Sequence, residues 1–233
     1  MNTVNSDEVN KFSSIADEWW DINGKFKKLH EMNPIRIEYI KDNIIKKFQT
    51  IENKKILDIG CGGGLLCEPM ARMGGIVTGV DASEENINIA KMHAQKQNLN
   101  INYTANNIEN LPINQKYDVI TAMEIIEHVD NIPLFLESCC NLLNDNGILF
   151  ISTMNRTPKS FLQTIIIAEY ILNWIPKGTH NWNKYPKPSE INDIINKYDI
   201  YIQDIKGIKY NLLNNNWHLT NKIDINYIMT CYK

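Results

Sequence analysis

The stretch ILDIGCGGGLL, residues 56–66, decides the fold of this chain. An apolar run ends at Ile59, a turn carrying Gly60, Gly62 and Gly64 follows, and a helical pattern begins near Leu65. Glycine has no Cβ, so this spacing lets the backbone turn tightly and approach a ligand closely. The stretch therefore predicts a strand, a ligand-binding turn and a helix at the edge of a parallel sheet.

An acidic residue supports this prediction. Asp81 ends the next apolar run, GIVTGVD, 21 residues after Gly60. At this spacing a carboxylate can accept hydrogen bonds from both hydroxyls of a ribose. A dinucleotide fingerprint, G-x-G-x-x-G, would place glycine at position 65, where this chain has Leu65. The pattern favours a nucleoside without a pyrophosphate, and a purely structural turn is the alternative.

Apolar runs and helical patterns alternate from Lys54 onward, which indicates an α/β fold with a mostly parallel sheet and helices on both faces. The last two of seven expected strands would pair antiparallel at the sheet edge. The strands are expected at 54–60, 75–81, 101–105, 117–123, 147–153, 200–210 and 223–233, and two helices at 83–97 and 132–143.

The chain is expected to form a single domain with two parts. Residues 1–50 have helical character, interrupted at Gly24 and Pro34, and would form a lid over the carboxyl edge of the sheet. Residues 51–233 would form the core, with an insertion near 156–190 that faces the substrate or a membrane.

Composition narrows the function. The 233 residues carry a net charge of -3, with no basic field for a polyanion, so nucleic acid is not expected as a partner. Five cysteines without a Cys-x-x-Cys pair argue against a disulfide framework and a structural zinc site. The N-terminus resembles neither a signal nor a transit peptide. These features predict a cytoplasmic protein.

LDIGCGGG followed by VTGVD resembles the S-adenosylmethionine-dependent methyltransferases of the Rossmann-like class I fold. Four further segments are similar to the ubiquinone biosynthesis O-methyltransferases, and the similarity runs from about Phe12 to the C-terminus. They are residues 17–40, 121–129, 152–160 and 168–191. The resemblance implies methyl transfer from S-adenosylmethionine to a phenolic oxygen, first of a polyprenyl benzenediol and later of 3-demethylubiquinol.

The same resemblance implies cofactor contacts at Arg36, Gly60, Asp81 and Met123. Arg36 would reach the cofactor carboxylate from the lid. Methyltransferases of this class often place an aspartate against the adenine amine after the third strand. This chain has Asn107 there, which would use its amide oxygen instead.

MEIIEHV, residues 123–129, carries the candidate chemistry. On a helix Glu124, Glu127 and His128 would share one face, and two carboxylates with an imidazole can bind a divalent cation such as Mg²⁺. A phenol is mostly protonated at neutral pH, so it needs either such a Lewis acid or a base. His128 is the candidate catalytic base. Helix capping by the acids is the third interpretation.

SFLQTIIIAEYILNWIP, residues 160–176, is apolar but too short and too interrupted to span a bilayer. Such a helix must be covered by the core, a partner or lipid. Burial in the core is the default interpretation. Because the substrate has an isoprenoid tail, the alternative is peripheral contact with the inner face of the membrane through this helix and Trp174. A complex of ubiquinone biosynthesis enzymes is another expected partner, and His180 could contact the substrate.

Two competing functions belong to other classes. One is a nicotinamide-dependent oxidoreductase on a similar sheet, against which Leu65 and the lack of a Tyr-x-x-x-Lys pair argue. The other is a non-catalytic cofactor-binding scaffold subunit.

Overall fold

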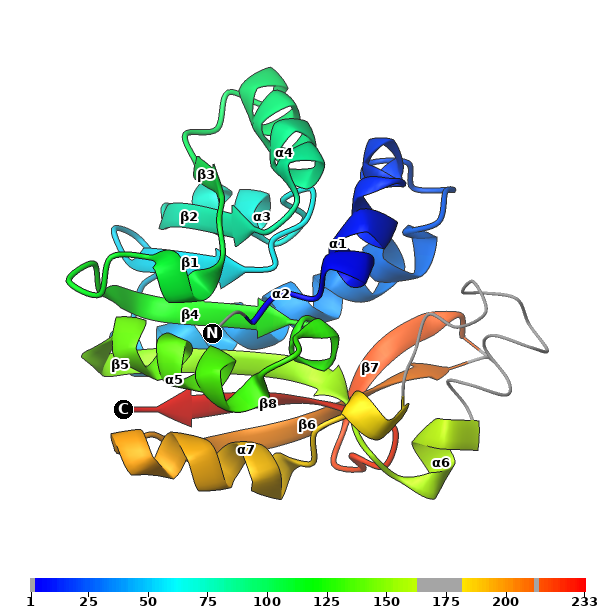
Figure 1. The fold of residues 1–233 in the computed structure, drawn as a ribbon, viewed down its shortest axis with the longest axis vertical. Helices are drawn as coiled ribbons and strands as arrows, with labels where there is room; N and C mark the ends of the chain where they lie inside the picture. Colours follow the sequence, from blue (N-terminus) through cyan, green and yellow to red (C-terminus); the bar gives the residue numbers. More distant parts are fainter. Residues whose placement is uncertain (1–2, 163–181, 212–213) are drawn as a thin grey trace.

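One sheet of eight strands runs through the described part of the computed structural model, which comprises residues 3–162, 182–211 and 214–233 (Figure 1). Its strand order is β3-β2-β1-β4-β5-β8-β6-β7. Strands β1 to β5 pair in parallel, whereas β8 runs antiparallel to both β5 and β6, and β7 antiparallel to β6. The bounds are β1 Lys55–Ile59, β2 Ile76–Asp81, β3 Asn102–Ala105, β4 Tyr117–Met123, β5 Leu143–Met154, β6 Tyr201–Asn211, β7 Asn216–Thr220 and β8 Asn226–Tyr232.

This sheet has one strand more than the seven predicted. The antiparallel pair of β6 and β8 is confirmed. The additional strand β7 pairs with the C-terminal part of β6 and forms the edge of the sheet. Its pairs with β6 run from Gly207 and Thr220 to Asn211 and Asn216. Five residues, NWHLT, give little local strand signal. This segment is a strand because it pairs with the long strand β6, and such a long-range contact cannot be predicted from the five residues alone.

Alternate residues of the parallel strands pack on opposite faces of the sheet, as the two-residue period of a strand requires. Leu57 and Ile120 belong to a core cluster with α5 and α7, whereas Ile56 and Val119 belong to a second cluster with α2, α3 and α4. The helices are α2 Lys27–Phe48, α3 Cys67–Arg72, α4 Glu84–Lys96, α5 Ile132–Leu142 and α7 Pro188–Ile195, and the short 3-10 helices are η2 Ile108–Asn110, η3 Ile126–His128, η5 Trp182–Lys184 and η6 Asn196–Tyr198. Helices therefore cover both faces, as predicted.

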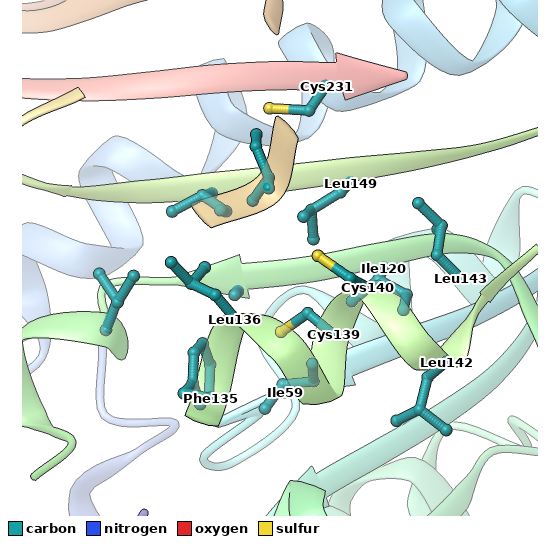
Figure 2. Packing of buried hydrophobic residues seen from close by; sticks show 14 of the residues in the cluster. Ile59, Ile120, Phe135, Leu136, Cys139, Cys140, Leu142, Leu143, Leu149 and Cys231 are labelled. Atoms are coloured by element: carbon teal, nitrogen blue, oxygen red, sulfur yellow. The ribbon is translucent and has the colours of Figure 1, made fainter. Parts of the chain in front are cut away.

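Helix α5 is anchored in the first cluster, which Figure 2 shows. Phe135, Leu136 and Cys139 of this helix belong to the same buried cluster as Ile120 and Leu149 of the sheet. Each buried apolar side chain of this size contributes about 1.5–3 kcal/mol. The loop between β4 and α5, which carries the MEIIEHV motif, is thus held firmly at both ends.

The N-terminal segment contains α1 Ser6–Ser13, the 3-10 helix η1 Ala16–Glu18 and α2. The predicted interruption at Gly24 is confirmed, but that at Pro34 is wrong, because Pro34 lies inside α2. A proline inside a helix costs about 3 kcal/mol. Beyond it, Tyr39, Ile40 and Ile44 are buried in the second cluster, and their burial outweighs that cost.

The apolar stretch 160–176 falls mostly outside the described residues, as do Trp174 and His180. Its first residue, Ser160, is the last residue of the short helix α6 Pro158–Ser160, which the Thr157 side chain caps. Across the described part of the chain, no helix has both the length and the apolar character needed to cross a bilayer.

Candidate active site

The glycine loop follows β1 and is hydrogen-bonded to Asp81 at the end of β2. Gly62 has a left-handed φ of +52° and its N–H donates to Asp81 Oδ2 at 2.9 Å. Asp81 Oδ1 accepts from Ser83 N at 2.9 Å and from Asn86 Nδ2 at 3.3 Å. A carboxylate has about four acceptor positions, so a position is left for a ligand hydroxyl. Burial raises the pKa of Asp81, and these hydrogen bonds oppose that rise.

Asp58 is a cavity residue to which the sequence pattern assigned no role. It is buried within β1 and accepts hydrogen bonds from Thr121 Oγ1 at 2.7 Å and Cys67 Sγ at 3.2 Å. Burial raises its pKa to about 6. The available signal was an acid inside an otherwise apolar strand, directly before the glycine loop. Buried carboxylates of this kind mark functional sites more often than chance.

Arg36 of α2 lines the cavity. Its side chain is 3% exposed, and Nη2 lies 2.9 Å from Glu124 Oε1. Within the described part of the chain, neither Nε nor Nη2 has an aligned hydrogen-bond acceptor. A buried guanidinium with donors left over is suited to a ligand carboxylate, which it can bind through two parallel hydrogen bonds.

Two tryptophans of the N-terminal segment cover the glycine loop. A Cβ built on Gly62 would lie 2.4 Å from Trp19 Cζ2, so the indole ring lies directly on the loop backbone. Trp19 stacks on Phe26 with centroids 3.9 Å apart, and its Nε1 donates to Asn86 Oδ1 at 2.8 Å. Trp20 Nε1 donates to Gly63 O at 3.0 Å. The sequence signal for this cover was the pair of tryptophans in a charged segment.

Glu124 does not lie on a helix with the other two residues of its motif. Its φ is +52°, and η3 begins only at Ile126. The predicted common helical face is therefore wrong, because the chain turns through a left-handed residue directly after β4. Glu124 Oε1 accepts from Ser152 Oγ at 2.8 Å and faces Arg36. The capping interpretation is also wrong: η3 has no side-chain cap, and Asn131 caps α5.

Glu127 and His128 are engaged by different partners. Glu127 Oε2 accepts from Thr153 Oγ1 at 2.7 Å, and burial together with the charge of Glu124 raises the pKa of Glu127 to about 7. His128 Nδ1 lies 2.9 Å from Glu8 Oε2 of α1. Burial lowers the pKa of His128, but the hydrogen bond to Glu8 and the neighbouring carboxylates outweigh it, and the pKa is raised overall.

A metal site is not assembled in this conformation. Among the residues that the structure describes, no three His, Cys, Asp or Glu side chains form a group that could hold a metal ion. Glu124 faces Arg36, Glu127 faces Thr153 and His128 faces Glu8. The donor set itself suits Mg²⁺, since a cation would offset the repulsion between the two carboxylates. Ligation by these three residues stays a prediction.

The site residues meet at a cavity of about 340 Å³, lined by residues at the carboxyl ends of β1, β2 and β4 and by residues of the N-terminal segment. Figure 1 shows the ribbon of the N-terminal segment next to these strand ends. The cavity volume is within the range of small-molecule sites. Of the predicted residues, Arg36, Gly60, Asp81, Met123, Glu124, His128 and Asn107 line it. Glu127 is buried and does not line the cavity in this conformation.

The chain resembles known methyltransferases. Residues 51–218 match the family model of a methyltransferase domain. The chain is 52% identical to the ubiquinone biosynthesis O-methyltransferase of Pelagibacter ubique (strain HTCC1062), covering 98% of both chains. It is 46% identical to that of Rickettsia prowazekii (strain Madrid E), covering all of this chain and 92% of the relative.

Among solved structures, the magnesium protoporphyrin IX methyltransferase from Synechocystis PCC 6803 with bound SAH is similar, with a TM-score of 0.69 and 16% identity over 97% of this chain and 99% of the other. The plantazolicin methyltransferase in complex with a desmethyl analogue and SAH has a TM-score of 0.64 and 20% identity, covering 97% of this chain and 96% of the other. These structures confirm the predicted fold, the Rossmann-like class I methyltransferase fold.

Proposed function

The chain belongs to the ubiquinone biosynthesis O-methyltransferases, and from this membership we propose that its cavity binds S-adenosylmethionine beside a phenol and transfers the methyl group to the phenolic oxygen. The acceptors are a polyprenyl benzenediol and 3-demethylubiquinol. Family membership gives no support to a nicotinamide-dependent oxidoreductase or to a scaffold subunit.

The observation that carries the cofactor assignment is the pair of complementary charges in one cavity. Arg36 has buried donors without aligned acceptors, which suit the cofactor's amino-acid carboxylate, and Asp81 has acceptor capacity for its ribose. Met123 ends β4 at the cavity and offers an apolar contact for the adenine or the sulfonium. The Gly60–Gly64 turn brings the backbone close to the ligand.

Methyl transfer from a sulfonium is an in-line displacement, in which an oxygen–carbon bond forms as the carbon–sulfur bond breaks. The protein has to align the three atoms and exclude water that would compete as a nucleophile. Trp19 covers the glycine loop, Phe26 stacks on the Trp19 ring, and both are largely buried, so they can keep water from the cofactor side. His128 lines the cavity and is the candidate base for the phenolic proton.

Magnesium held by Glu124, Glu127 and His128 is the alternative means of activating the phenol. The ion would act as a Lewis acid that lowers the pKa of the ortho-diol. The closeness of the Glu124 and Glu127 carboxylates, whose charges repel each other and would be neutralised by a cation, supports it. The separate partners of the three side chains in the described structure favour the base.

One assay tests both the activity and the means of activation. Methyl transfer to a short-tailed catechol is measured with and without a chelator. If His128 acts as a base without a metal, the chelator leaves kcat unchanged. Loss of methyl transfer on chelation, restored by added Mg²⁺, would instead identify the metal route. No methyl transfer under either condition would contradict the proposed function.

The polyprenyl tail of the acceptor is the basis for peripheral contact with the inner face of the membrane through residues 160–176. Phe161 and Leu162, at the described start of this segment, are 43% and 49% exposed. Exposed apolar side chains at this end of the segment support an interfacial role. Co-sedimentation with anionic and neutral vesicles tests it, and protein that stays in the supernatant with both would contradict it. A complex with other ubiquinone biosynthesis enzymes would similarly spare the tail from water.

A further inference from the structure

Helix α1 holds the His128 ring with two side chains from one of its faces. Glu8 Oε2 lies 2.9 Å from His128 Nδ1, and the Phe12 ring meets the imidazole edge-on with centroids 5.3 Å apart. Glu8 and Phe12 are four residues apart, so they lie one above the other on the helix. Both line the cavity beside His128. A residue 120 positions away in the sequence thus sets the orientation of the candidate base.

The contact with Glu8 also selects the tautomer of His128. An ionised carboxylate can only accept a hydrogen bond, so the proton of a neutral imidazole must be on Nδ1. A glutamate side chain has an ordinary pKa well below neutral, so Glu8 carries a carboxylate that can accept this hydrogen bond. The lone pair of the neutral ring is then on Nε2. This is the arrangement by which a buried carboxylate orients a histidine base in other enzymes.

Contacts on both sides of Glu8 fix α1 over the sheet. Before it, Thr3 donates to Glu109 from its backbone N at 3.0 Å and from Oγ1 at 2.6 Å. After it, Ser13 Oγ donates to Ser83 Oγ at 2.7 Å. These contacts at Thr3 and Ser13 hold the helix that carries Glu8 in place, and residues between Thr3 and Asn33 line the cavity with it.

We propose that Glu8 is a positioning residue of the methyl transfer: it holds His128 in the Nδ1–H tautomer and leaves Nε2 for the chemistry, and it does so only when residues 3–33 cover the cavity. The proposal rests on the proposed function only in giving His128 a chemical task. Cover and catalytic machinery are then formed in one step, because the same helix encloses the ligand and orients the ring.

The test compares Glu8→Ala and Glu8→Gln with a matched control, Asp7→Ala. Asp7 is the neighbouring acid on the same helix and its side chain is exposed. In Glu8→Ala we expect kcat on a short-tailed catechol to fall about tenfold to a hundredfold, with the Kd of S-adenosylmethionine within about twofold of wild type. Glu8→Gln keeps an acceptor oxygen and is expected to recover part of the loss. Asp7→Ala is expected to behave as wild type.

A spectroscopic readout separates positioning from activity. Nitrogen-15 NMR of the histidine rings at about pH 9, assigned with His128→Asn, should show the Nδ1–H tautomer of His128 in the wild type and in Asp7→Ala, and a shift toward the Nε2–H tautomer in Glu8→Ala. An unchanged tautomer or an unchanged kcat in Glu8→Ala would overturn the proposal. So would a loss of cofactor affinity as large as the loss in kcat, because it would report lost cover alone.

The proposed function fails on a different result. If His128→Asn keeps full methyl transfer, the base assignment is wrong, while the tautomer shift in Glu8→Ala still shows whether Glu8 positions the ring. If His128→Asn is inactive and Glu8→Ala is fully active, the base assignment survives and the positioning role is wrong.

Discussion

Replacing Gly62 with alanine tests how tightly the N-terminal segment covers the cofactor loop. The φ of +52° at Gly62 is a left-handed conformation, which costs a residue with a Cβ about 1–2 kcal/mol. The new Cβ would lie 2.4 Å from Trp19 Cζ2 and 2.5 Å from Cη2. Trp19 is stacked on Phe26 and hydrogen-bonded to Asn86, so its ring has little freedom to move away.

Overpacking of this kind costs about 1–3 kcal/mol, so the covered state should lose about 2–5 kcal/mol in total. For a chain of this length such a loss lowers Tm by roughly 4–20 °C. Because the loop and its cover both line the cavity, we also expect at least about tenfold weaker binding of S-adenosylmethionine. Thermal and urea unfolding measure the first effect, and titration calorimetry the second.

Two comparisons make this experiment decisive. Gly24→Ala adds the same methyl group within the N-terminal segment, where it would meet only the flexible Asp21 side chain at 3.1 Å, and it should change stability little. In the double variant Gly62→Ala with Trp19→Ala, the overlap is absent, so the two changes should be non-additive by about 1–3 kcal/mol. If Gly62→Ala matches Gly24→Ala in both stability and affinity, Trp19 does not rest on the loop and the reasoning is refuted.

Three further changes follow from the site. Asp81→Asn removes the charge that accepts the ribose hydrogen bonds and should weaken cofactor binding about tenfold to a hundredfold by calorimetry, with unaltered affinity contradicting the ribose contact. Arg36→Lys keeps the charge but loses the planar fork, so about tenfold weaker binding is expected, and equal affinity would show that the guanidinium makes no paired contact. Asp58 has its pKa raised from 3.8 to about 6, so the folded chain retains the proton at a pH where the unfolded chain has released it, and folding stability is lost as pH rises through this window. The free energy of unfolding of Asp58→Asn should therefore exceed that of the wild type by up to about 3 kcal/mol above pH 6, while cofactor binding weakens. Urea unfolding at several pH values measures this difference, and a difference that does not change with pH would contradict a buried charge at Asp58.

Local signals accounted for most of the parallel half of the sheet. The run ending at Ile59, the glycines after it and Asp81 at the end of β2 all lie where the pattern predicts. These positions depend on hydrophobic period and on backbone conformations that only glycine adopts cheaply, and both are properties of short segments. The helix over residues 84–96 was equally predictable from the sequence, because Ser83 is a favourable N-cap residue and caps it.

The pattern failed where long-range packing outweighed local preference. Pro34 by itself predicts the end of a helix, yet α2 continues past it because the residues beyond it bury an apolar face in the second cluster. Glu124 reads as part of a helix, but the Ser152 carbonyl accepts from its N–H and the chain turns left-handed there. Strand β7 exists because β6 is there to pair with it.

The α/β class, the glycine loop with Asp81 and the candidate groups in the motif after β4 can all be predicted from short segments of the chain. The tertiary structure decided how those groups are partnered. Glu8 reaches His128 across 120 residues, Arg36 reaches Glu124, and Trp19 lies on Gly62. The physical reason is that a strand, a turn or a cap depends on neighbours a few residues away, whereas a partner for a buried charge or ring depends on where distant elements pack.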